Sequence, residues 1–287
     1  MKIGIISHSI MYYFINKNEI CEHFGGSIYY GGTIAKNLNS KVYLYTKFGS
    51  DFIFRNKLLN YNFQLENSLS EKPTTRLKIN LYAPFELYLQ NLCEPINEIN
   101  YESDLIMINP VFHEFDMKSL SKPIKSILFL DPCGFLRCLN NNNQILLSKM
   151  ELDLKNISIL KLTGDEAFCL TGKKGILALR DLQKFDIRYV ILFQGNEIFV
   201  LDKNKLYTIS DKSFKFHNRF GLIDIFNSAF CCTYINEHDI LWALCFGGGA
   251  IQAAQEINNL NISNIPNKKM IETNAAYLYN LLKFTQL

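Results

Sequence analysis

The sequence predicts an α/β protein with a doubly wound, mainly parallel sheet, flanked by helices and carrying a small β lid. Short apolar segments alternate with helix-like stretches along most of the 287 residues. Several of the short segments are apolar throughout, which is typical of strands covered on both faces. Two aromatic segments with polar residues at alternate positions interrupt this rhythm. Strands that alternate with helices indicate βα units, so we expect one domain over 1–287.

The apolar segments define the strands of the main sheet. We expect strands at 2–7, 41–46, 104–109, 126–131, 157–162 and 189–195, and a hairpin over 196–210. The helix-like stretches between and after them predict the covering layers. We expect helices at 27–39, 51–60, 114–121, 142–150, 164–171 and 173–185, and helical structure over 222–256 and 267–283.

The two interrupting segments, 11–26 and 74–92, are rich in aromatic and β-branched residues. Their alternation with polar residues predicts antiparallel strands that form a flap on one side of the sheet. We expect this flap to act as a lid, and we consider a homodimer formed through it.

Composition excludes several classes of protein. The formal net charge is +3 and the basic residues form no block, so we expect no nucleic-acid partner. No apolar stretch reaches the length of a membrane span, and the N-terminus enters a strand pattern directly. We therefore expect a cytoplasmic protein with no membrane contact. The 8 cysteines form no CxxC pair, which favours buried free thiols over a metal site.

The stretch "HNRFGLIDIFNSAF" at 217–230 contains the most informative carboxylate. A helix that starts near Leu222 would have Gly221 at its N-cap. The backbone N–H groups of Leu222, Ile223 and Asp224 would then lack helical partners and would favour an anion at the positive end of the helix. A solvated aspartate at a helix start is the alternative interpretation of Asp224.

Further polar residues follow other expected strands. "FLDPCGFLR" at 129–137 ends a strand with an aspartate and then offers Arg137, which suits phosphate. "LKLTGDEAFCLTG" at 160–172 adds Lys161, Thr163 and Glu166 near a helix start. The carboxyl ends of parallel strands meet at one edge of the sheet, where open α/β folds bind ligands.

Taken in order, these segments resemble the ribokinase-like (PfkB) carbohydrate kinases, and in particular divergent archaeal-type members. "GGSIYYGGTIAKNLNSKVYLYTKFGSDF" is similar to the early substrate-side signature of that family. The 129–137 segment resembles its "D-P-x…R" motif, and the 160–172 segment its "K-x-N-x-x-E-A" stretch. "ILFQGNEIFVL" resembles its "T-x-G-x-x-G" turn, and "FGLIDIFNSAF" its C-terminal "G-A-G-D-x-F" motif.

The resemblance implies an ATP-dependent kinase that phosphorylates a hydroxyl of a sugar, polyol or nucleoside, with ATP and Mg²⁺ as cofactors. Asp224 would be the general base. The amides of Leu222 and Ile223, after Gly221, would stabilise the transferring phosphoryl group. Glu166 would hold Mg²⁺ through water.

The resemblance also assigns the binding residues. The nucleotide would contact Lys161, Thr163, Glu166, Gly195 and Gly248. The substrate would contact His8, Tyr12, Gly25, Gly26, Tyr30 and Arg137. A core histidine with satisfied hydrogen bonds is the alternative for His8, and packing beneath the lid is the alternative for the tyrosines.

The chain departs from the family pattern at positions that matter for these roles. Ile223 replaces the second glycine of the anion-hole motif, Thr163 replaces an asparagine, and Phe193 replaces a threonine. Tyr12 and Tyr30 stand where the family carries an aspartate and an asparagine. Two alternatives to an active kinase therefore remain. One is a catalytically impaired homologue that binds a nucleotide or metabolite as a sensor or partner, and the other is a different α/β enzyme.

Overall fold

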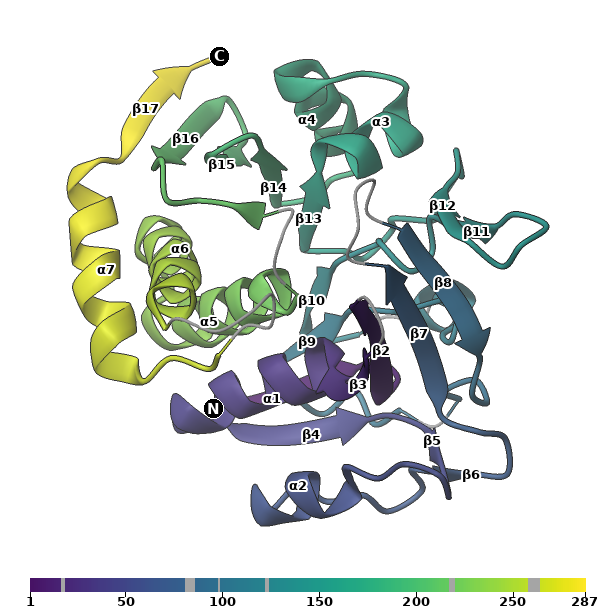
Figure 1. The fold of residues 1–287 in the computed structure, drawn as a ribbon. Helices are drawn as coiled ribbons and strands as arrows, with labels where there is room; N and C mark the ends of the chain where they lie inside the picture. The colour runs from purple at the N-terminus through teal and green to yellow at the C-terminus, as the bar shows by residue number, and fades with distance from the viewer. Residues whose placement is uncertain (17–18, 81–85, 98, 122–123, 217–219, 258–263) are drawn as a thin grey trace.

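The computed structural model of the chain is built around one large twisted sheet (Figure 1). It describes residues 1–16, 19–80, 86–97, 99–121, 124–216, 220–257 and 264–287. Across these residues the sheet has the order β17-β16-β15-β14-β13-β10-β9-β1-β4. The strands are β1 (Lys2–Ile6), β4 (Lys41–Tyr45), β9 (Leu105–Ile108), β10 (Ile127–Leu130), β13 (Ile159–Thr163), β14 (Tyr189–Gln194), β15 (Glu197–Asp202), β16 (Lys205–Ser210) and β17 (Lys283–Gln286).

The pairing of these strands confirms a mainly parallel sheet. Every neighbouring pair from β4 to β14 is parallel. The hairpin β15–β16 continues the sheet in antiparallel register from β14. The six expected strands and the hairpin are thus confirmed. The exposed edge strand β17 is not among the expected strands, and it lies almost entirely beyond the helical stretch expected at 267–283.

Two layers of helices cover the sheet, so the fold is doubly wound. α1 (Gly26–Asn37), α5 (Leu222–Glu237), α6 (Ile240–Glu256) and α7 (Lys268–Asn280) bury apolar residues against one face. α3 (Gly164–Thr171), α4 (Gly175–Gln183) and the 3₁₀ helix η1 (Met117–Ser121) cover the other face. The short α2 (Arg55–Asn60) lies beside β4 (Figure 1). It contributes Leu58 to the same core as α1, α5, α6 and α7.

The helix predicted at 142–150 is wrong. β12 (Ile145–Leu147) pairs there with β11 (Arg137–Leu139) as a small antiparallel hairpin. The side chain of Asn140 accepts hydrogen bonds from the backbone N–H groups of Asn142 and Gln144, and this local turn competes with a helix.

Two other helix predictions need correction. The 114–121 stretch is helical only as η1, from Met117 to Ser121. The stretch 222–256 is two helices, because His238 ends α5 in the left-handed conformation with φ 54°. The Asp239 side chain then caps α6 by accepting hydrogen bonds from Leu241 N and Trp242 N.

A second sheet lies on one side of the main one (Figure 1). Its order is β3 (Glu19–Gly25), β2 (Ile10–Asn16), β7 (Thr75–Asn80) and β8 (Glu86–Asn91). The strands fall in the two segments predicted for the lid, although 17–18 and 81–85 lie outside the described residues. The pair β2–β7 is parallel, so the expectation of wholly antiparallel strands is wrong. Its action as a lid, and a dimer formed through it, stay predictions. A two-stranded pair, β5 (Phe48–Gly49) with β6 (Leu69–Ser70), lies beyond β4.

The expectation of buried thiols holds for only half of the cysteines. All 8 are free: Cys93, Cys231, Cys232 and Cys245 are buried, Cys21 is exposed, and Cys133, Cys138 and Cys169 are partly exposed. Across the described residues, every helix is too short or too polar to cross a membrane.

The glycine run of α6 is a helix-packing feature. A Cβ on Gly249 would lie 2.6 Å from Ala275 N and 2.8 Å from Ile271 O, both backbone atoms of α7. A Cβ on Gly248 would lie 2.7 Å from the Ile209 side chain and 2.9 Å from that of Leu278. The run therefore lets α6 approach α7 and the sheet closely.

Substituting Gly249→Ala is expected to destabilise the protein by about 1–3 kcal/mol, because backbone atoms of α7 cannot move aside without shifting the helix. Gly31→Ala is the matched control. It also lies inside a helix, but its Cβ would meet nothing nearer than 3.7 Å. The control is expected to be neutral or slightly stabilising, since alanine favours the helix. Urea unfolding of both variants measures the difference, and equal stabilities would contradict this account of α6–α7 packing.

Candidate active site

A cavity of about 190 Å³ lies at the carboxyl edge of the main sheet, beside the N-terminal turns of α1, α3 and α5. The strand ends β1, β9, β10 and β13 all contribute to it, as the parallel topology requires. Its lining consists of Ser7, Ile10, Tyr12, Gly26, Ser27, Leu77, Asn109, Pro110, Val111, Asp131, Cys133, Arg137, Lys161, Thr163, Glu166, Ile223 and Asp224.

Lys161, on β13, is the electrostatic centre of this cavity. Its side chain is 2% exposed, and Nζ lies 2.8 Å from Asp131 Oδ2 and 3.8 Å from Glu166 Oε2. Burial opposes the charge on the lysine, but the Asp131 and Glu166 carboxylates outweigh it and raise the pKa of Lys161 above its usual value. The ammonium group therefore stays charged between two acids.

The two acids are fixed by hydrogen bonds of their own. Asp131 Oδ2 also accepts from Asn227 Nδ2 of α5 at 3.0 Å. Glu166 Oε2 accepts from Thr163 N at 2.7 Å, and Glu166 N donates to Thr163 Oγ1 at 3.4 Å. This reciprocal arrangement is a capping box at the start of α3. Thr163 thus has a structural role in addition to its place in the cavity wall.

Asp224 lies in the first turn of α5, where the sequence placed it. Gly221 is the N-cap with φ 86°, and the first helical hydrogen bond runs from Ile225 N to Gly221 O at 2.9 Å. The N–H groups of residues 222–224 therefore precede the helical series, as predicted. Ile223 lies inside the helix and needs no positive φ, so the missing second glycine does not strain the turn.

The carboxyl group of Asp224 is perturbed by its surroundings. Burial raises its pKa to about 6, and a hydrogen bond from the Ser27 hydroxyl to Oδ1 works in the opposite direction. Asn109 Nδ2 in turn donates to Ser27 Oγ at 3.0 Å. The aspartate is therefore held at the cavity wall and titrates close to neutral pH.

Arg137 and Tyr12 also line the cavity. Arg137 donates from NH1 to Val111 O at 2.7 Å, and among the described residues no carboxylate lies within ion-pair distance of it. Its guanidinium can thus meet an anion. The Tyr12 ring rests on Gly25, where a Cβ would lie 1.9 Å from the ring.

Some predicted substrate and nucleotide residues lie elsewhere. His8 is wrong as a substrate contact, because Nε2 lies 2.8 Å from Glu94 O and Nδ1 2.8 Å from Thr75 Oγ1 in the core. Tyr30 is fully buried behind the N-cap, with its ring 2.5 Å from a Cβ placed on Gly221. It packs, as the alternative interpretation held, and does not line the cavity.

Of the remaining predicted site residues, some line the cavity and others lie outside it. Gly26 and Ile223 line the cavity, whereas Gly25 supports the Tyr12 ring and Leu222 is buried in the core. Gly195 forms an open turn after β14 with φ 62°. Gly248 is enclosed by the side chains of Ile209 and Leu278 and is absent from the cavity lining, so here it serves helix packing and not the contact with a nucleotide that the resemblance implies.

Sequence reasoning missed three residues of the site. The sequence pattern shows Asp131 at a strand end and Ser27 beside the double glycine, but it indicates no role for either. Asn109 is simply the last residue of an expected strand. All three side chains act through partners distant in sequence, such as the 197 positions between Ser27 and Asp224.

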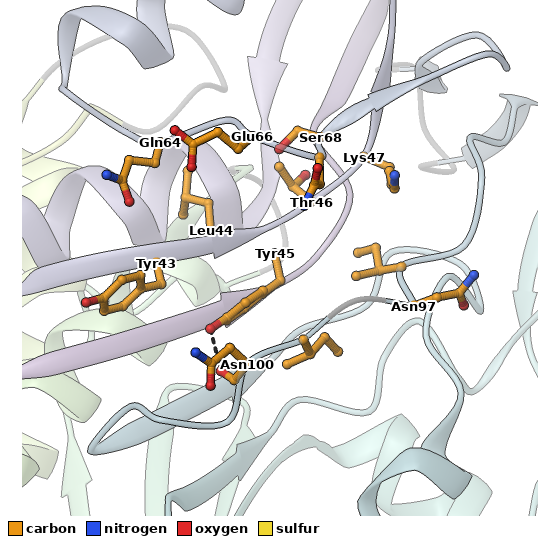
Figure 2. Close-up of a pocket in the computed structure, with 13 residues that line it drawn as sticks. Tyr43, Leu44, Tyr45, Thr46, Lys47, Gln64, Glu66, Ser68, Asn97 and Asn100 are labelled. Carbon is orange, nitrogen blue, oxygen red and sulfur yellow. Dashed lines mark hydrogen bonds between the residues drawn. The ribbon is translucent and has the colours of Figure 1, made fainter.

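A second hollow, of about 540 Å³, runs along the outer edge of β4 (Figure 2). Tyr43 and Tyr45 line it from β4, and the Tyr45 hydroxyl donates to Asn100 O. Its only charged lining residues among those described are Lys47 and Glu66. It brings together no set of acids and bases like that of the smaller cavity.

Comparisons with known proteins agree with this architecture. Neither a family model nor a curated protein matches the chain. A pyrophosphate-dependent kinase in the ribokinase family, solved as a sulfate complex, is 20% identical with a TM-score of 0.77, over 95% of this chain and 99% of that one. The chain has the ribokinase fold. A ribokinase from Thermotoga maritima is 16% identical with a TM-score of 0.72, over 94% of this chain and 98% of that one.

The similarity extends to a nucleoside kinase from Methanocaldococcus jannaschii, described as an archaeal member of the ribokinase family. It is 16% identical with a TM-score of 0.71, over 96% of this chain and 98% of that one. The fold class predicted from the sequence is therefore confirmed. The archaeal-type character stays a prediction.

Asp224→Asn is expected to stabilise the fold at pH 8 by about 1–3 kcal/mol, because roughly two pKa units correspond to that free energy. The folded pKa of Asp224, about 6, lies above the ordinary 3.8, so the wild type loses stability as the pH rises through that window. The gain should vanish below about pH 4, where both chains are neutral at this position. Urea unfolding from pH 4 to 8 measures it, and a pH-independent difference would contradict the perturbed pKa.

Proposed function

We propose that this chain is a kinase that transfers a phosphoryl group to a hydroxyl of a small acceptor, such as a sugar, polyol or nucleoside. One observation carries the proposal. The Asp224 carboxyl, with a pKa of about 6, shares one cavity with the first turn of α5, Lys161 and Arg137. Phosphoryl transfer requires a general base, hydrogen-bond donors that stabilise the phosphoryl oxygens, and cations, and this cavity combines all three kinds of group.

In the proposed reaction, Asp224 takes the proton of the acceptor hydroxyl as its oxygen attacks the terminal phosphorus. The new O–P bond forms while the bond from that phosphorus to the donor's bridging oxygen breaks, and the leaving group departs with that oxygen. A base with a pKa of about 6 is largely ionised at pH 7 and close enough to it to accept a proton effectively. The free N–H groups of residues 222–224 would receive the charge of the transferring group.

Lys161 and Arg137, which both line the cavity, would hold the donor phosphates. Arg137 presents a planar guanidinium that suits a phosphate group, whereas Lys161 acts as a point charge fixed by Asp131. Ile223 contributes an apolar wall that excludes water from the reacting atoms.

The cavity also fits Mg²⁺ bound together with a donor. Three carboxylates and only two basic side chains line it, so a phosphate donor needs an added cation to offset the like charge. Among the described residues, no group of three or more His, Cys, Asp and Glu residues forms a preformed metal site. Mg²⁺ commonly keeps several waters and binds one or two carboxylates plus substrate phosphates. Glu166 would hold it through water, and the ion would neutralise donor oxygens.

Mg²⁺–ATP is the donor that the family resemblance implies. Inorganic pyrophosphate is the second candidate, and the aromatic packing on β14 favours it. Phe193, on that strand, stands where the resembled family carries a threonine, and it packs edge-on against Phe216 and Phe226 with ring centroids 4.9 and 4.7 Å away. A cavity of about 190 Å³ is also smaller than the roughly 300–1,000 Å³ typical of drug-sized ligands. One similar structure is itself of a pyrophosphate-dependent kinase.

Turnover tests this function directly. The purified protein is incubated with Mg²⁺, either ATP or pyrophosphate, and a panel of sugars, polyols and nucleosides, and ³¹P NMR follows phosphomonoester formation. Asp224→Asn is expected to lower turnover by roughly 10²–10⁴, because a general base is lost while the shape is kept. Lys184→Gln, a substitution on the exposed surface, is the control and should leave turnover unchanged.

Two outcomes would contradict the proposal. Equal turnover in Asp224→Asn would remove Asp224 as the base. No product with either donor, accompanied by a thermal shift on adding Mg²⁺ and donor, would favour the impaired homologue that only binds.

A further inference from the structure

Asp224 receives a hydrogen bond from a side chain that the sequence did not single out. Ser27 stands in the first turn of α1, is 3% exposed, and donates its hydroxyl proton to Asp224 Oδ1. Asn109, just after β9, donates from Nδ2 to Ser27 Oγ at 3.0 Å. A serine hydroxyl has a single proton, and the asparagine already occupies one of its acceptor positions. The direction of this relay is therefore fixed, from Asn109 through Ser27 to Asp224.

The relay leaves the other carboxylate oxygen available. Within the described residues, the Asp224 side chain accepts its hydrogen bond from Ser27 at Oδ1, and the residue lines the cavity. Ser27 and Asn109 also line it, and both are nearly buried. The hydrogen bond from Ser27, which Asn109 holds in place, thus restricts the rotation of the carboxylate and leaves Oδ2 as the oxygen that would accept a proton.

We propose that Ser27, oriented by Asn109, is a positioning residue that holds Asp224 for proton abstraction and sets the pH at which it can act. The inference rests on the proposed kinase function. Ser27 acts through Asp224 and need not touch the reacting atoms.

Other charged and titratable groups also shift the pKa of Asp224, independently of Ser27. Asp131 at the end of β10 raises its pKa, whereas Lys161 on β13 and Arg137 on β11 lower it. The hydroxyls of Tyr12 on β2 and Tyr30 on α1 face the same carboxylate. A substitution at Ser27 leaves all of these groups in the protein. The resulting change in the pKa of Asp224 therefore measures the effect of the Ser27 hydrogen bond.

Ser27→Ala is expected to move the acid limb of the kcat/KM pH profile upward by about one to two pH units, because a hydrogen bond to the ionised form is lost. Ser27→Thr keeps the hydroxyl and should restore the wild-type limb. Ser7→Ala is the matched control, since Ser7 lines the same cavity but bonds to His8 O instead of Asp224. Its profile should keep the wild-type midpoint.

A readout that needs no turnover separates this inference from the kinase proposal. The pH dependence of unfolding reports the folded pKa of Asp224 directly. In Ser27→Ala, the window over which stability falls with rising pH should extend upward by the same amount, and Asp224→Asn should lack it. An unmoved window, or a shift equal to that of Ser7→Ala, would overturn the inference. An upward shift without turnover would leave the inference standing and count against the kinase.

Discussion

The buried ion pair between Lys161 and Asp131 is the interaction on which the site depends. It joins β13 to the end of β10 at 2.8 Å, and both side chains are almost completely buried. A buried pair of this kind seldom adds net stability over apolar residues of the same size, yet losing one partner is strongly destabilising. The neighbouring contacts serve to keep both charges satisfied: Asn227 bonds Asp131, and the capping box of α3 holds Glu166 near the ammonium. Since the ion pair adds little stability, its charges are better explained by a role in the chemistry of the cavity.

Two tyrosine rings pack on glycines, one at the cavity wall and one behind it. Tyr12 lies over Gly25 and Tyr30 over Gly221, and neither glycine has room for a Cβ. Tyr12 lines the cavity, whereas Tyr30 is buried behind the N-cap of α5. The Tyr30 ring leaves room at that N-cap only for a glycine, and Gly221 there adopts a left-handed φ of 86°. The aromatic packing therefore supports the N-terminal turn of α5, which carries Asp224.

Much of the fold could be predicted because fully buried parallel strands are apolar throughout, and segments such as 104–109 stand out without knowledge of their partners. The hairpin at 137–147 was missed because its side chains are only partly buried and follow no clear period. In the site, Asp224 and Lys161 could be named from local motifs. His8 could not be assigned correctly, since its ring is satisfied by Glu94 and Thr75, which are distant in the sequence. The hydrogen bonds from Asn109 to Ser27 and from Ser27 to Asp224 could not be predicted either, because they join residues that are distant in the sequence.

The most direct measurement is a ¹³C NMR titration of the Asp224 carboxyl, assigned by its absence in Asp224→Asn. The account predicts a midpoint near pH 6 in the free protein. It also predicts that Mg²⁺ with methylenebisphosphonate, a non-hydrolysable analogue of pyrophosphate, perturbs the signal, because the base and the donor share one cavity. A midpoint at the ordinary 3.8, with a signal that ignores Mg²⁺ and the analogue, would contradict the central claim that this cavity is a phosphoryl-transfer site.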